Sequence, residues 1–113
     1  MKIYWDDTLA ECGIYHLCIN DKTLASIYDI RVKAETNIKL HDWERKKMLD
    51  EGNYEFSTCF DGFSHSHYTN AATLEEAKAE AITWFINYYT RGIEQAKERI
   101  KYCEKMIKIF EEV

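Results

Sequence analysis

Residues 73–113 have the sequence TLEEAKAEAITWFINYYTRGIEQAKERIKYCEKMIKIFEEV, and this segment decides the fold. It opens on Thr73, followed three residues later by Glu76, which is the spacing of a capping box. In that motif the Thr73 hydroxyl accepts a hydrogen bond from the Glu76 amide, and the Glu76 carboxylate accepts one from the Thr73 amide. Apolar residues then recur at intervals of three and four, the period of an α-helix. The sequence therefore predicts a helix that begins at residue 73.

Two apolar stripes run along this helix. We expect the first to pack on a sheet; it comprises Leu74, Ala77, Ala81, Trp84, Phe85 and Tyr88. The second stripe, called the helix seam below, comprises Ile82, Ile86, Tyr89, Ile93, Ala96, Ile100, Cys103, Ile107 and Phe110. Its spacings alternate between four and three, and this 3.5-residue period is typical of a coiled coil. Past Gly92, the predicted interface residues are Ile93, Ile100, Cys103, Ile107 and Phe110.

Gly92 leaves two alternatives for the C-terminal half. The seam keeps its phase across Gly92, as expected of one continuous helix, and a glycine inside a helix costs only about 1 kcal/mol. Alternatively, Gly92 ends the helix in left-handed geometry, and the chain from Ile93 onward folds back as a second helix that covers the seam. A continuous helix of about 40 residues would be roughly 60 Å long, and its seam would need a partner.

Upstream of residue 72 the apolar residues mostly alternate, which is the period of β-strands. We expect strands over residues 2–5, 13–19, 23–32, 54–60 and 63–69, with tight turns at residues 20–22 and at Asp61-Gly62. Residues 38–49 mix apolar and charged side chains, which favours a connecting loop with one or two helical turns. The expected fold class is therefore α+β: an antiparallel sheet of four to five strands, built from hairpins, packed on a long C-terminal helix or helical hairpin.

Length and composition favour a single domain over residues 1–113, strand-rich over 1–72 and helical over 73–113. The chain has 113 residues, of which 46% are hydrophobic; this is enough for one core and too short for two. It contains no apolar run of the 18 or more residues that a membrane span needs, and no secretory signal. We therefore expect a cytoplasmic protein that does not bind membranes and whose four cysteines are free thiols.

The motifs of the commonest enzymes are missing from the sequence. It has no nucleophile elbow, no phosphate-binding glycine loop and no HExxH zinc motif. We therefore expect a protein that is not an enzyme, with no catalytic residue and no cofactor. The histidines and cysteines lack the usual metal-ligand spacing. A metal-binding domain or hydrolase that uses His65 and His67, joined by His16 and Cys18 if their strands are neighbours, is retained as an alternative.

Acidic residues outnumber basic ones by 20 to 15, and the net charge is -5. This balance disfavours direct nucleic-acid binding, which requires a basic face. Carboxylates near strand ends and in loops, together with an aromatic content of 14%, favour a surface that binds a protein with a basic surface. The predicted acidic face comprises Asp6, Asp7, Asp21, Asp42, Glu44, Asp50, Glu51 and Asp61.

In profile, though in no motif, the chain is similar to the small proteins of phages and mobile elements that inhibit host defence nucleases, among them anti-CRISPR proteins. The resemblance implies a protein-interaction module: an inhibitor that acts in the host cytoplasm and blocks a basic, nucleic-acid-binding partner. It transfers no site residues. The main alternative is a structural or assembly protein that forms a homodimer through the helix seam.

Overall fold

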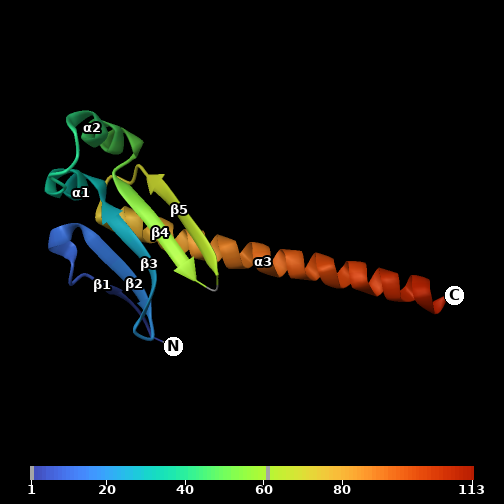
Figure 1. The fold of residues 1–113 in the computed structure, drawn as a ribbon. Helices are drawn as coiled ribbons and strands as arrows, with labels where there is room; N and C mark the ends of the chain where they lie inside the picture. Colours follow the sequence, from blue (N-terminus) through green and yellow to red (C-terminus); the bar gives the residue numbers. More distant parts are fainter. Residues whose placement is uncertain (1, 61) are drawn as a thin grey trace. The chain divides into compact units, whose positions relative to one another are not determined.

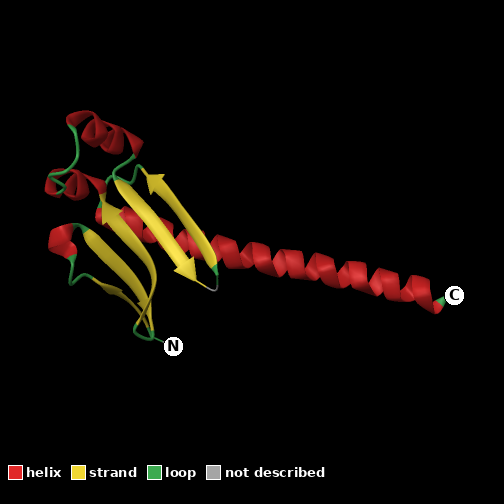
Figure 2. Ribbon diagram, viewed as in Figure 1, coloured by secondary structure: helices red, strands yellow, loops and turns green. Residues whose placement is uncertain are grey.

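The computed structural model describes residues 2–60 and 62–113, which form one antiparallel sheet and several helices (Figure 1). The sheet contains β1 (Ile3–Asp6), β2 (Ile14–Ile19), β3 (Lys22–Asp29), β4 (Tyr54–Phe60) and β5 (Phe63–Thr69), in the order β1-β2-β3-β4-β5. The helical segments are η1 (Ala10–Cys12), α1 (Ile30–Thr36), α2 (Asp42–Glu51) and α3 (Leu74–Glu111) (Figure 2). The structure confirms the α+β class, with a five-stranded sheet and a long C-terminal helix.

The chain divides into two compact units. The N-terminal unit, Met1–Ala79, holds the sheet, the helices between its strands and the first residues of α3. The C-terminal unit, Glu80–Val113, consists of the rest of α3 and the last residues of the chain.

Turn chemistry fixes the first tight hairpin of the sheet. Ile19 of β2 pairs with Lys22 of β3, so only Asn20 and Asp21 lie in the turn. Both have positive φ, 49° and 67°, and asparagine and aspartate tolerate this left-handed region better than other residues that carry a Cβ. A two-residue turn of this kind matches the twist of the strands that it joins.

One face of the sheet carries the core of the N-terminal unit. Leu17, Ala25, Ile27 and Phe56 share this face through direct cross-strand pairing, and each is only 2% exposed. Thr58 lies on the same face and is equally buried. Its hydroxyl donates a hydrogen bond to the Leu24 carbonyl at 2.7 Å. A buried hydroxyl with a partner avoids the cost of an unpaired polar group.

The first residues of α3 are held to this face by Lys78. Its Nζ lies 5.2 Å from the centre of the Trp5 ring and 5.5 Å from that of Tyr15, and it forms an ion pair with Asp7 at 3.3 Å. The Lys78 side chain is only 13% exposed, and an ammonium taken from water favours the negative faces of aromatic rings. Lys78 thus joins α3 to β1 and β2 within the N-terminal unit.

The structure corrects the predicted strand over residues 23–32, because the strand ends at Asp29 and α1 begins at Ile30. Asp29 is the N-cap of this helix, and its carboxylate accepts hydrogen bonds from the amides of Arg31 at 3.0 Å and Val32 at 3.5 Å. These bonds satisfy two amides that a helix start leaves unpaired. The cap therefore overrides the strand preference of the β-branched residues Ile30 and Val32.

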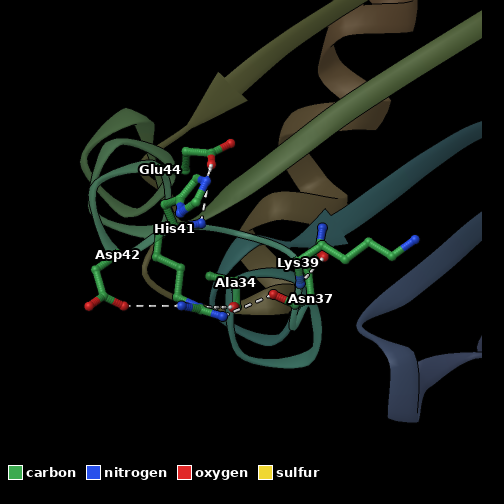
Figure 3. A network of polar contacts seen from close by, with 7 residues as sticks. Ala34, Asn37, Lys39, His41, Asp42 and Glu44 are labelled. Atoms are coloured by element: carbon green, nitrogen blue, oxygen red, sulfur yellow. Dashed lines mark hydrogen bonds and ion pairs between the residues drawn. The ribbon is translucent and has the colours of Figure 1, made fainter.

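The predicted loop with one or two helical turns is replaced by α2, a regular helix of ten residues. Arg45 joins α2 to the preceding helix. Its guanidinium donates to the carbonyls of Ala34 and Asn37, both at 3.0 Å, and to the Asp42 carboxylate at 3.2 Å (Figure 3). The Glu44 carboxylate also accepts from the His41 amide at 3.1 Å, at the start of α2. Arg45 therefore has a structural role between α1 and α2.

At the start of α3 the expected cap forms with one change of partner. The Thr73 hydroxyl accepts from the Glu76 amide at 3.2 Å, as predicted. The Glu76 carboxylate accepts from the amide of Ala72 at 3.0 Å rather than from that of Thr73. Two amides near the helix start are satisfied in either arrangement.

The helix α3 continues without interruption across Gly92. It spans 38 residues, about 57 Å at 1.5 Å per residue. Gly92 is not among the residues with positive φ, so it does not adopt the left-handed geometry of a C-cap. The helical-hairpin alternative is therefore wrong, and the long helix is correct.

Replacing Asp29 tests the cap of α1. We expect Asp29→Ala to lower the free energy of unfolding by about 1 kcal/mol, the usual cost of losing an N-cap. Asp29→Asn keeps an oxygen acceptor and should cost less than half as much, because the ion pair with the half-exposed Arg31 contributes little. Urea denaturation of the three proteins measures the difference. Equal losses for alanine and asparagine would assign the effect to the charge instead of the cap.

Replacing Gly92 by alanine tests the continuity of α3. A Cβ at this position has open space, with no atom within 4 Å, and alanine favours a helix over glycine by up to about 1 kcal/mol. We expect Gly92→Ala to raise helicity measured by circular dichroism at 222 nm, together with the thermal midpoint. A left-handed glycine would give the opposite result, because a Cβ is strained there.

Candidate functional site

The helix seam is the longest apolar feature on the surface of α3. All nine of its residues are exposed, and the exposed fraction is 60% for Ile86, 58% for Ile93, 56% for Ile100, 56% for Ile107 and 70% for Phe110. The C-terminal unit has no second helix among its described residues, so no element of that unit covers the seam. The structure therefore displays the predicted interface residues in a single line along one helix.

Aromatic rings lie beside the seam near the start of the C-terminal unit. Trp84 stacks on Tyr88 with the ring centres 5.4 Å apart, and Phe85 meets Trp84 edge to face at 5.0 Å. Tyr88 in turn meets the seam residue Tyr89 edge to face at 5.2 Å. Edge-to-face and offset contacts suit the charge distribution of aromatic rings. Trp84, Phe85, Tyr88 and Tyr89 thus form a continuous row of ring contacts on this part of the helix.

Charged residues flank the seam further along α3. Lys97, Arg99 and Glu104 are adjacent in sequence to seam residues, and all three are exposed. The Arg99 guanidinium lies 5.6 Å from the centre of the Tyr102 ring. Over residues 96–104 the exposed apolar line of α3 thus has exposed charged residues beside it.

The acidic residues predicted to form one face are distributed over both ends of the sheet. Asp6 ends β1 and Asp7 follows it, at the end of the sheet that holds η1. Asp21 occupies the β2–β3 turn at the opposite end. Asp61 lies outside the described residues. The remaining acids belong to α2, and they are Asp42, Glu44, Asp50 and Glu51.

Several of these carboxylates already have partners inside the N-terminal unit. Asp7 pairs with Lys78, and Asp42 pairs with Arg45. Asp6 accepts from the Thr8 amide at 3.0 Å, and this hydrogen bond lowers the pKa of Asp6. These carboxylates are therefore less available to pair with the basic residues of a partner protein.

Next to the acids of α2 is a shallow cavity of about 290 Å³. It lies between α2 and β5, and its walls include Trp43, Met48, Glu51 and Tyr68. Trp43 is 67% exposed and Tyr68 43%. Burial and the nearby Glu51 carboxylate raise the pKa of Tyr68. Part of the predicted acidic face thus adjoins exposed aromatic rings here.

His65 and His67 lie together, but His16 and Cys18 do not join them, because their strands are not neighbours. His16 and Cys18 lie on β2, and His65 and His67 lie on β5; β3 and β4 separate the two pairs. A nitrogen of His65 is hydrogen-bonded to one of His67 at 2.8 Å, while His16 bonds the Ser26 hydroxyl at 2.7 Å. Within residues 2–60 and 62–113, no group of three or more histidine, cysteine or acidic residues could hold a metal ion.

The role of Lys78 could not be predicted from the sequence. It lies 71 residues from Asp7 along the chain, and no motif connects it with Trp5 or Tyr15. The only signal was its position in the first turns of α3, between the apolar residues Ala77 and Ala81. The four cysteines are free; Cys18 is buried, and Cys12, Cys59 and Cys103 are exposed.

Comparison with known protein families, with curated proteins and with solved structures gives no match for this chain. None of the helices among the described residues combines the length and apolar character needed to cross a membrane.

Titration of Tyr4 tests the environment of Asp21. The Tyr4 hydroxyl donates to the Asp21 carboxylate at 2.9 Å, which raises the pKa of Tyr4 to about 12. Because an unperturbed tyrosine has a pKa of about 10, this contact stabilises the fold below pH 10, and its contribution is lost as the pH rises through 12.

We expect Asp21→Asn to shift the pKa of Tyr4 back toward 10, and Asp7→Asn to leave it unchanged. NMR of tyrosines labelled with ¹³C at Cζ follows each ring separately. A Tyr4 signal that titrates alike in wild type and Asp21→Asn would contradict the contact.

Proposed function

We propose that this protein is a structural or assembly protein that forms a homodimer through the helix seam of α3. The observation that carries the proposal is the continuity of α3 across Gly92, with every seam residue exposed. A helix that folded back would cover the seam within one chain. A continuous helix leaves this line of apolar side chains in water, and a second copy supplies a matching line.

The period of the seam supports pairing with another helix. A spacing of 3.5 residues keeps the apolar line facing one partner over the whole contact, through a left-handed supercoil. An isolated surface helix that packs on a globular core has a broader apolar face. Here Lys97, Arg99 and Glu104 occupy the flanking positions between residues 97 and 104, so the apolar line is bordered by charge over that part of α3.

The exposed isoleucines give the pairing a driving force comparable with the entropic cost of association. Each of Ile86, Ile93, Ile100 and Ile107 is between 56% and 60% exposed. Burying an isoleucine completely contributes roughly 1.5–3 kcal/mol, so the half-exposed side chains of two copies together supply on the order of 10 kcal/mol. This falls within the 4–15 kcal/mol or more that association costs in translational and rotational freedom. The other seam residues add to the favourable side.

Binding of a basic partner by the acidic face stays a prediction, as does inhibition of a host nuclease. The cavity beside Trp43 and Tyr68 is the part of the surface that suits it, since acids and exposed aromatic rings meet there. We further propose that the protein acts in the cytoplasm.

A charge placed in the seam tests the proposal. We expect wild-type protein to have the mass of a dimer by light scattering in reducing buffer, and Ile100→Asp to have the mass of a monomer. A carboxylate buried without a partner between two helices is strongly unfavourable. The N-terminal unit should stay folded in the variant, as judged by near-ultraviolet circular dichroism of its aromatic residues.

Ile109→Asp is the matched control, because Ile109 is also an exposed isoleucine of α3 and lies outside the seam. It should remain a dimer. A monomeric wild type, or equal masses for the two variants, would overturn the proposal.

A further inference from the structure

The residues of the helix seam fall into two alternating sets of positions, one of which contains only isoleucine. Successive isoleucines lie seven residues apart, at Ile86, Ile93, Ile100 and Ile107. In heptad notation these are the a positions, which makes Ile82, Tyr89, Ala96, Cys103 and Phe110 the d positions. Among parallel coiled coils, β-branched residues at a combined with leucine at d favour two strands; this seam has the β-branched a positions and no leucine at d. From this register, the charges at its edges and the length of seam that each orientation keeps in contact, we infer that two copies of α3 pair parallel and in register, an inference that rests on the proposed function.

The charges at the edges agree with a parallel pair. In such a pair a g residue of one helix faces the e residue five positions later in the other. Arg99 occupies a g position and Glu104 the e position that follows it. The twofold symmetry of the dimer therefore forms two pairs of opposite charge, Arg99 with Glu104 of the second copy and the reverse. Both side chains are exposed in the single chain.

An antiparallel pair of α3 helices is less favourable than the parallel pair in each of the three registers in which most of the two seams overlap. When the pair is centred between Ala96 and Ile100, Arg99 faces its own copy, and so does Lys97. Shifting the helices toward residue 82 relieves this repulsion but leaves Phe110 without a partner. Shifting them toward residue 110 leaves Ile82, Ile86 and Tyr89 unpaired. Only the parallel, in-register pair keeps the entire seam in contact.

Cys103 reports the orientation, because in a parallel pair each d residue meets its own copy. We propose oxidation with diamide in a Cys12→Ser, Cys59→Ser background, since both of those cysteines are exposed and Cys18 is buried. Diamide takes up two electrons and two protons from two thiols while the Sγ–Sγ bond forms. The covalent dimer is then measured on a non-reducing gel.

A second position makes the test decisive. In an antiparallel pair only one point along the helix meets its own copy, whereas in a parallel pair every d position does. We therefore add Cys103→Ser with Ala96→Cys, which moves the thiol one heptad along the seam. In a parallel dimer both proteins cross-link in most of their chains, at least tenfold more than Cys103→Ser without a new cysteine.

The outcomes separate this inference from the proposed function. A dimer by light scattering in which both positions cross-link supports the parallel pair. A dimer in which at most one position cross-links overturns the parallel orientation and leaves the dimer standing. A monomer by light scattering in reducing buffer overturns both.

Discussion

Unbroken backbone hydrogen bonding along α3 is the constraint on which the interpretation of this molecule depends. A helix keeps residues three and four apart on one face only as long as its ladder continues. Because α3 passes Gly92 in helical geometry, Ile86 and Ile107 stay on the same line although they are 21 positions apart. A reversal at Gly92 would instead bring the two ends of the seam against each other inside one chain.

The sequence predicted those parts of the fold that depend on neighbouring residues. The strands Tyr54–Phe60 and Phe63–Thr69 match their predicted bounds, and the turn predicted over residues 20–22 forms at Asn20-Asp21, with Lys22 already in β3. Alternation and turn residues act over two to four positions, so a single sequence contains all the information that they need. The seam was equally visible, because its period is a property of one segment. Its exposure was not, since that depended on the geometry at Gly92.

Other features depend on contacts between distant residues, and the sequence alone did not predict them. The strand preference of Ile30 and Val32 was apparent, but the ability of Asp29 to cap a helix at that point was missed. Arg45 holds α1 and α2 together through backbone carbonyls, which leave no mark in the sequence. The acidic residues were predicted to share a face because they lie near expected strand ends and in loops. The order of the strands then decided which end of the sheet each one occupies.

Each strand of the sheet pairs only with the strands next to it in sequence order. This topology affects the order in which the parts of the protein fold. No strand waits for a segment far downstream, so the entropy lost in closing each loop stays small, and sheets of this kind form quickly for their size. The strands are also synthesised before α3. The sheet can therefore complete its pairing while the seam is still being made, and two chains would meet through α3 only afterwards. In the proposed dimer, association would then be the last step of maturation, and the one step whose rate depends on how many copies the cell contains.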